Sequence, residues 1–464
     1  MIQNDNYFEW EDGFDVIENI QADLYVNDIL KVSDVYIDKI EAARSNSGLL
    51  NIELLTKEPI YSDLIDGEKE IYNLKIDIKI REPNFYHFSS IVIAKAFFGT
   101  HTISYIPPFS KTRIKAKGVV YASNKQHAIL KEWYGCSNVL NFDNGFVSSK
   151  EVSETTTYKN GKRVAFKISR QWGNRDSNSF WVKLDTYKFK ISLIKPSPNT
   201  SEYARYVFEY REQWGEIPNP EVRRDISVLL SFIIGAKLIK FGESFFDFKR
   251  ITRKEYLALS PIDSSLLYQA NFPFYSDCYS RNDTDIVIKQ IPKMIKRYFL
   301  LKEKYRLDEV LPALFVRSYL NFNFINYVTY IEMFANVEIE KKPTIISKTA
   351  FREVIKRLNQ VKGIPKSIRD KFQTLNLIGV GKKTERLLVK HKIDYSVYHD
   401  VFSVRGRVVH GAKVDISKMY VASEKAKELL TILTLRKLGY IGFVRSFTNN
   451  NELISVRDMS KILL

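Results

Sequence analysis

The sequence predicts an α+β protein with more than one domain, in which a β-rich N-terminal domain precedes an all-α C-terminal bundle. The chain has 464 residues, which is more than a single hydrophobic core usually serves. Apolar residues alternate with polar ones in much of the first half, whereas they recur at helical spacing from residue 284 onward. We therefore predict a β-rich domain over residues 1–283 and a helical domain over residues 284–464.

Residues 71–211 are expected to form antiparallel β-structure. In the segment 74–80, apolar side chains alternate with charged ones, which is the period of a half-buried strand. Asn160-Gly161 stands between two strand-like runs and favours the positive φ angles of a tight hairpin. Residues 181–194 and 203–210 are predicted as two further strands, because turn-forming residues at 196–199 separate them.

A helix is predicted to begin at Pro220 and to continue as far as Ile239. Asn219 can cap its first turn, proline suits the first helical position, and Glu221 complements the positive end of the helix dipole. A further strand is expected over 241–251. The chain then becomes irregular up to residue 283, where Pro273 and Asn282-Asp283 break regular structure.

The C-terminal domain is expected to consist of helices joined by short loops, as in an antiparallel bundle. Pro292 and Pro312 are interpreted as marks of first turns or kinks. The predicted helices cover residues 285–305, 311–338, 348–361, 365–375, 382–391, 396–409 and 416–438.

The charge of the chain is large and unevenly distributed. The formal net charge is +17, yet residues 1–70 contain 17 acidic and 5 basic side chains, a net of −12. Residues 341–418 contain 19 basic and 6 acidic side chains, a net of +13 over 78 positions. A block this basic favours a polyanionic partner, for which nucleic acid is the leading candidate.

The compartment is expected to be the cytoplasm, without a membrane. The two cysteines, Cys136 and Cys278, are far apart and have no metal-ligand spacing, which suits free thiols in a reducing environment. The N-terminus is polar and acidic, unlike a signal peptide. The longest apolar run, residues 226–239, is 14 residues long and includes Lys237, so it is too short to span a bilayer.

The segment Val401-Phe-Ser-Val-Arg-Gly-Arg-Val-Val-His-Gly places Arg405 and His410 five residues apart in the most basic part of the chain. In metal-free RNA cleavage the ribose 2′-OH attacks the adjacent phosphorus, so the site needs a proton acceptor, a proton donor and a cation. Histidine can fill either proton role near neutral pH. The planar fork of arginine can hold two phosphate oxygens. One Arg–His pair supplies few of the groups that this reaction needs, which suggests that two copies of the pair meet across a dimer interface.

At these residues the chain resembles a known family. Arg405-Gly-Arg-Val-Val-His410 is similar to the Arg-x(4–6)-His signature of HEPN domains. The longer string from Val401 to Gly411 resembles the ApeA-like branch, which reads apolar-Arg-Ser-x-apolar-Val-His-Gly. A glutamate in the first helix of the bundle is also usual in that family, and Glu332 stands in the corresponding place. The resemblance covers the last third of the chain closely and the rest in outline.

The resemblance implies a metal-independent endoribonuclease with no cofactor, acting in prokaryotic antiphage defence of the abortive-infection type. It implies a homodimer through the HEPN domain, RNA as substrate with transfer RNA among the candidates, and a phage-derived trigger or protein partner at the N-terminal domain. Arg405 and His410 match the catalytic pair, for phosphate stabilisation and proton transfer respectively. Glu332, Arg407 and Gly411 would support the site, and Gly411 is expected to end its helix in a left-handed conformation.

One residue departs from the family pattern. The position after the motif arginine is commonly polar, and here it is Gly406, which removes a side chain and loosens a helix by about 1 kcal/mol. Some HEPN domains are inactive and serve only for dimerisation or RNA binding. A non-catalytic scaffold with a degenerate HEPN domain is therefore the alternative function.

Two weaker signals compete with this interpretation. Leu377-Ile-Gly-Val-Gly-Lys-Lys-Thr384 resembles the hairpin of a helix-hairpin-helix motif, although Glu385 stands where that motif has a small residue; the alternative is an interhelical turn with glycine at a helix C-cap. In either case Lys382 and Lys383, and also Lys413, are candidate contacts for RNA. Glu243 with Asp247-Phe-Lys249 faintly resembles a metal-dependent DNA nuclease core.

Overall fold

The computed structural model describes residues 17–44, 49–58, 72–80, 90–106, 109–122, 128–137, 150–159, 162–171, 178–194, 204–247, 250–267, 281–315, 319–339, 347–361, 379–446 and 453–456. The chain divides into two compact units. The β unit comprises Met1–Arg224 and Ala236–Asn271, and the helical unit comprises Asp225–Gly235 and Phe272–Leu464. The predicted order of β-structure followed by helices is confirmed. The predicted boundary falls between residues 283 and 284, and the units divide between residues 271 and 272.

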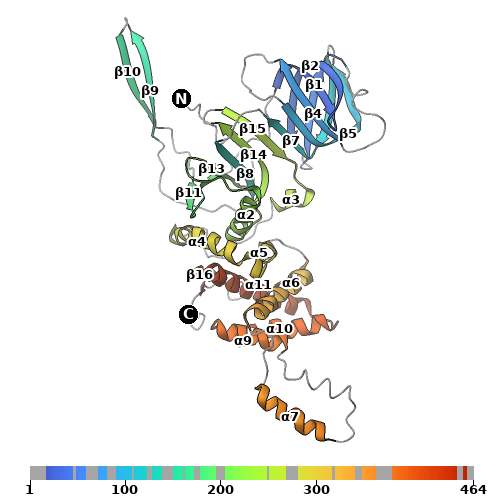
Figure 1. Cartoon of the computed structure of the whole chain (residues 1–464), viewed down its shortest axis with the longest axis vertical. Helices are drawn as coiled ribbons and strands as arrows, with labels where there is room; N and C mark the ends of the chain where they lie inside the picture. Colours follow the sequence, from blue (N-terminus) through green and yellow to red (C-terminus); the bar gives the residue numbers. More distant parts are fainter. Residues whose placement is uncertain are drawn as a thin grey trace. The chain divides into compact units, whose positions relative to one another are not determined.

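Within the described residues, the β unit is built on one sheet of 13 strands, whose pairings are antiparallel. Several of these strands are labelled in Figure 1. The strands of this sheet are β1 (Ile17–Val26), β2 (Ile29–Arg44), β3 (Leu50–Thr56), β4 (Tyr72–Ile80), β5 (Ser90–Ile106), β6 (Phe109–Ala116), β7 (Gly118–Ala122), β8 (Ile129–Cys136), β11 (Asn178–Lys183), β12 (Lys188–Ile194), β13 (Ala204–Arg211), β14 (Ile239–Asp247) and β15 (Arg250–Leu257).

Part of this sheet closes on itself. β4 pairs with β1, β1 with β2, β2 with β3, β3 with β6, β6 with β5, and β5 with β4. Alternate side chains of each strand point inward, so that Leu50, Ile52 and Leu54 of β3 are buried. The predicted strand at 74–80 is confirmed as β4. No strand is predicted within the acidic first 70 residues, yet β1, β2 and β3 lie there.

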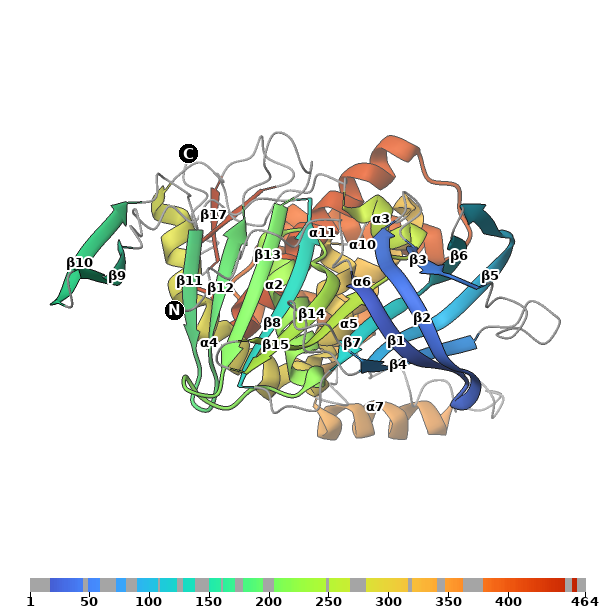
Figure 2. The same ribbon diagram turned by 90° about the horizontal axis from the view of Figure 1, so that it is seen from above.

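The rest of the sheet runs in the order β11-β12-β13-β8-β14-β15-β7, and β7 joins it to β5 (Figure 2). The prediction of one strand at 203–210 is confirmed as β13. The prediction of single strands at 181–194 and 241–251 is wrong, because each segment folds back on itself. β11 and β12 are joined by a tight turn in which Leu184 donates its N–H to the Tyr187 carbonyl, and β14 and β15 pair from Asp247 opposite Arg250.

β9 (Lys150–Lys159) and β10 (Lys162–Gln171) form a separate two-stranded ladder. Their register places Lys159 opposite Lys162, which leaves two residues for the connection and confirms the predicted hairpin. Asn160 and Gly161 themselves lie outside the described residues, as do the predicted turn at 196–199 and Pro273.

The helix predicted at Pro220 is α2 (Pro220–Ile234), followed later by the short α3 (Pro261–Leu266). The Asn219 side chain accepts the N–H of Val222 at 2.9 Å, which confirms the N-cap. The predicted end at Ile239 is wrong, because Gly235 takes a φ of 78° and turns the chain out of the helix. Ile239 instead begins β14.

The helical unit follows the predicted helices in most places. Its helices are α4 (Arg281–Tyr305), α5 (Leu307–Phe315), α6 (Leu320–Glu338), α7 (Lys348–Gln360), α9 (Val380–Lys390), α10 (Tyr395–Val409) and α11 (Ile416–Leu438). The segment 311–338 is two helices, and Pro292 and Pro312 lie inside α4 and α5, beyond their first turns. The prediction that this region contains only helices is wrong, because β16 (Phe443–Arg445) and β17 (Leu453–Ser455) form a short antiparallel ladder. The helix predicted at 365–375 lies outside the described residues.

The core of the helical unit is formed around α11. This helix packs against α4, α6 and α10, and its residues 428–435 are all buried. A helix that is buried on every side has lost the usual polar stripe. It therefore gives α6 and α10 a fixed support, and these two helices contribute the site described next. No helix among the described residues is long and apolar enough to cross a membrane.

Candidate active site

Arg405 is positioned by the buried face of α10. Asp394 caps this helix by accepting the N–H of Ser396 at 2.8 Å. Tyr398 and Val401 are fully buried, and Arg405 follows them at the spacing that continues the same face. The Arg405 side chain therefore starts from the packed face of α10, and it remains 32% exposed.

The guanidinium of Arg405 meets the carboxylate of Glu332 on α6. Nε lies 2.9 Å from Oε1 and Nη2 lies 3.2 Å from Oε2, so the contact is bidentate. Glu332 is mostly buried, between neighbours of α6 that belong to the core. Such a pair fixes the plane of the guanidinium, and the contacts of the described residues include none at Nη1. The structure therefore brings together the predicted phosphate-binding arginine and the predicted supporting glutamate.

His410 stands at the exposed end of α10. It is the C-cap residue, and its N–H donates to the Gly406 carbonyl at 3.2 Å. Beyond it, Gly411 donates to Val408 at 3.1 Å and Ala412 donates to Arg407 at 2.9 Å, which is the bonding pattern of a Schellman motif. Gly411 has a φ of 72°, so the predicted left-handed end of the helix is confirmed. The imidazole is exposed, and among the described contacts none joins it to Arg405.

The two glycines of this segment are expected to respond in opposite ways to alanine. Gly406→Ala should stabilise the helical unit by about 1 kcal/mol, because Gly406 is inside α10 and no atom lies within 4 Å of an added Cβ. Gly411→Ala should destabilise it by about 1 kcal/mol, because a left-handed φ is strained for alanine. Thermal unfolding followed at 222 nm measures both changes. Equal shifts in the same direction would contradict this account of the helix end.

The other predicted site residues lie on α9, on α10 and in the connection between α10 and α11. Arg407 and Lys413 are exposed. Lys382 pairs with Glu385 at 2.7 Å on α9, and Lys383 donates to the Asn336 side chain at 2.9 Å. Lys382 and Lys383 are therefore each held near the surface by a neighbouring acceptor.

The segment with Gly379 and Gly381 begins α9. Gly379 is the N-cap of this helix and has no atom within 4 Å of an added Cβ, and neither has Gly381. The alternative of a glycine at a helix C-cap is thus wrong at this position. The close approach that a helix-hairpin-helix would require of its glycines is not present at these two residues. Leu377 and Ile378 lie outside the described residues.

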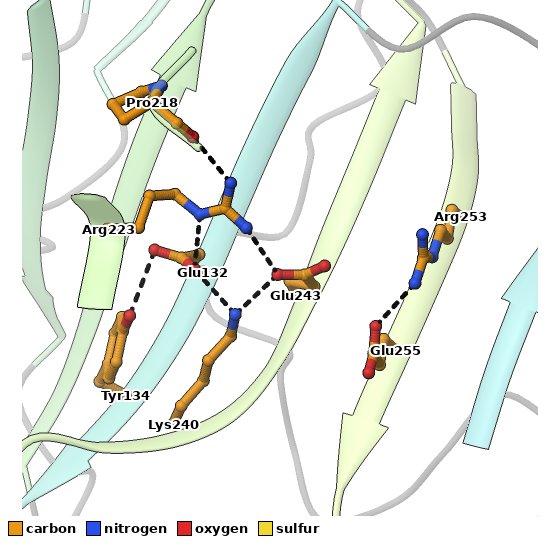
Figure 3. Close-up of polar contacts among 8 residues, drawn as sticks. All are labelled: Glu132, Tyr134, Pro218, Arg223, Lys240, Glu243, Arg253 and Glu255. Carbon is orange, nitrogen blue, oxygen red and sulfur yellow. Dashed lines mark hydrogen bonds and ion pairs between the residues drawn. The ribbon is translucent and has the colours of Figure 1, made fainter. Parts of the chain in front are cut away.

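A buried ring of charges occupies the β unit and was not anticipated from the sequence. Glu132 on β8 and Glu243 on β14 are direct cross-strand neighbours, an arrangement in which like charges repel. Arg223 of α2 contacts Glu132 at 2.9 Å and Glu243 at 3.3 Å. Lys240 contacts the same two carboxylates at 2.7 and 2.6 Å, so opposite charges alternate around a closed ring (Figure 3).

In this ring the charge of the buried Glu243 carboxylate is balanced by Arg223 and Lys240. Burial disfavours the charged form of Arg223, but Glu132 and Glu243 outweigh burial and raise the pKa of Arg223; the pKa of Lys240 is raised for the same reason. In the part of the chain that the structure describes, no three His, Cys, Asp or Glu side chains are arranged to hold a metal ion. Lys249 of the faint nuclease motif lies outside the described residues.

Comparison with known proteins adds no relative from which a role could be transferred. No protein-family model, no curated protein and no solved structure matches this chain.

Proposed function

We propose that this chain is a metal-independent endoribonuclease whose C-terminal region is a HEPN domain of the ApeA-like kind. The observation that carries the proposal is the bidentate Arg405–Glu332 pair, which fixes a guanidinium on the helix that ends at His410. A fixed cation and an exposed imidazole on one short helix are two of the three groups that metal-free RNA cleavage needs. The resemblance of the string from Val401 to Gly411 supports the same assignment.

The reaction would proceed by transfer within the RNA. The ribose 2′-oxygen forms a bond to the adjacent phosphorus while the bond to the 5′-oxygen breaks. One imidazole takes the 2′-OH proton, another proton is delivered to the leaving 5′-oxygen, and the guanidinium of Arg405 holds the phosphate oxygens. The products are a 2′,3′-cyclic phosphate and a 5′-hydroxyl. Because one histidine cannot give and take a proton in the same step, two protomers would supply two copies of His410.

The surface beside His410 supports a homodimer. Val409, Ile416, Tyr420 and Val421 are large apolar residues with exposed side chains on α10 and at the start of α11. Exposed apolar groups that cluster around a functional residue are typical of an interface between subunits. A second copy packed here would exclude water and bring its own Arg405 and His410 to the same groove.

The role in the cell follows the same resemblance. The β unit would recognise a phage-derived trigger or a protein partner, and the helical unit would then cut RNA, transfer RNA among the candidates, in antiphage defence. The alternative is a non-catalytic RNA-binding scaffold. It is favoured by Gly406, which lacks the usual polar side chain, and by the exposed, unanchored imidazole of His410.

Purified full-length protein tests the proposal when it is incubated with total cellular RNA in EDTA. We expect cleavage that leaves 2′,3′-cyclic phosphates, and a sedimentation mass of about twice 54.2 kDa. Cleavage that occurs only with a divalent cation would contradict the proposal. Tight RNA binding without cleavage, with and without phage lysate, would favour the scaffold.

A further inference from the structure

Glu338, the last residue of α6, is surrounded by positively charged side chains. Its side chain is only 4% exposed, and it lies 3.2 Å from Lys390 Nζ and 3.0 Å from His391 Nε2, with Lys437 Nζ as its third partner. Burial alone would raise the pKa of the Glu338 carboxyl, but the hydrogen bonds from His391 and Lys437 outweigh it and lower the pKa to about 2. The carboxylate is therefore ionised at any physiological pH.

The cations around this carboxylate outnumber it. Lys304 of α4 lies with its Nζ 5.5 Å from the centre of the Tyr305 ring, and Lys437 of α11 lies 5.2 Å from the same ring. Burial lowers the pKa of Lys437, and repulsion from Lys390 and Lys304 adds to this effect against the attraction of Glu338. Two ammonium groups, those of Lys390 and Lys437, thus share one carboxylate, and the third, that of Lys304, lies over the Tyr305 ring beside Lys437. An excess of positive charge therefore remains among these groups.

The arrangement fits an extended anion with several charges. The side chain of Lys390 is 53% exposed and Lys304 is exposed, so both ammonium groups can reach a ligand in solvent. Tyr305 is buried, and its ring therefore offers no face on which a base could stack. Lysines bind phosphate as point charges and do not read sequence. These features favour a phosphodiester backbone as the ligand.

We propose that Lys304 and Lys390 form a binding site for the phosphate backbone of RNA, in which Glu338 orients Lys390 and the largely buried Lys437 adds positive charge behind them. The proposal rests on RNA being the substrate, as proposed above, and adds a second contact to it. Glu332 and Glu338 are six residues apart on α6, which is about 9 Å along the helix axis. A single RNA strand is long enough to contact both Arg405 and this site.

The test uses the full-length chain with His410→Ala, which is expected to slow cleavage by roughly 10²–10⁴-fold, and a 20-nucleotide single-stranded RNA as probe. Lys304→Gln with Lys390→Gln should weaken binding roughly tenfold at 0.1 M salt and reduce the slope of log K against log salt by about 1.4, or 0.7 for each lost phosphate contact. The matched control is Lys289→Gln with Lys296→Gln, which removes the same charge from exposed positions of α4. It should change the affinity less than twofold.

Two results would overturn the proposal. One is an unchanged RNA affinity in the Lys304/Lys390 variant. The other is an equal loss of RNA affinity in the control, which would show that the effect depends only on net charge. Thermal unfolding of both variants should match the parent, since all four substitutions are at exposed lysines. The outcome is separable from that of the cleavage proposal. If the protein binds RNA through Lys304 and Lys390 but never cuts it, the binding site is supported and the cleavage proposal fails. If the protein cuts RNA but the Lys304/Lys390 variant binds RNA with unchanged affinity, only the binding site is refuted.

Discussion

Replacing His410 by alanine should lower the rate of RNA cleavage in EDTA by roughly 10²–10⁴-fold, the contribution of a positioned general acid or base. The substitution removes the imidazole at the end of α10 and leaves the Arg405–Glu332 pair in place. His410 is exposed and its own contact is made through the backbone N–H, so the fold should be unaffected. The rate is measured under single-turnover conditions with a 5′-labelled RNA.

His399→Ala is the matched control for this variant. His399 is also an exposed histidine of α10, and its ring packs against Tyr395 with a centroid distance of 5.9 Å. It is more than two helical turns before His410, and its loss should leave cleavage within twofold of the wild-type rate. If both variants cut RNA as the wild type does, the activity belongs to another part of the chain or to a contaminant.

Arg223→Ala should destabilise the β unit by about 3–5 kcal/mol, because it leaves two buried glutamates facing each other across β8 and β14 with one cation fewer. Lys240 alone would have to neutralise both carboxylates. With a urea m value of about 2–3 kcal/mol/M for a unit of this size, the unfolding midpoint should fall by about 1–2.5 M.

The tryptophan distribution makes this measurement specific to one unit. All five tryptophans lie within residues 1–271, so intrinsic fluorescence reports the β unit, while ellipticity at 222 nm is dominated by the helical unit. The control is Arg224→Ala, the next residue of α2, whose side chain is 68% exposed and 3.8 Å from Glu221. An exposed pair of this kind contributes about 0–1 kcal/mol. Equal midpoints for the two variants would show that the ring does not stabilise the unit.

Several elements were predictable because their signals are local. Asn219 begins α2 and Gly411 ends α10, since a cap depends only on hydrogen bonds to residues two to five positions away. The period of 74–80 is enough to predict β4. Where two strands are joined by a tight polar turn, as in β11 and β12, the same period continues through the turn and hides it. The end of α2 at Gly235 was missed because the apolar run continues past the glycine into β14.

Short-range periodicity and spacing are enough to predict the order of β-structure and helices, the segment with Arg405 and His410, and the end of the helix that carries it. The pairing of Arg405 with Glu332 is different, because Glu332 is 73 residues earlier in the chain and the contact exists only once α6 and α10 have packed together. The ring of Glu132, Arg223, Lys240 and Glu243 likewise depends on the register of β8 and β14, because a shift of one residue would turn a glutamate of the facing pair away from Arg223 on α2. Contacts of this kind are set by packing over the whole unit, so the sequence around one residue does not indicate its partner.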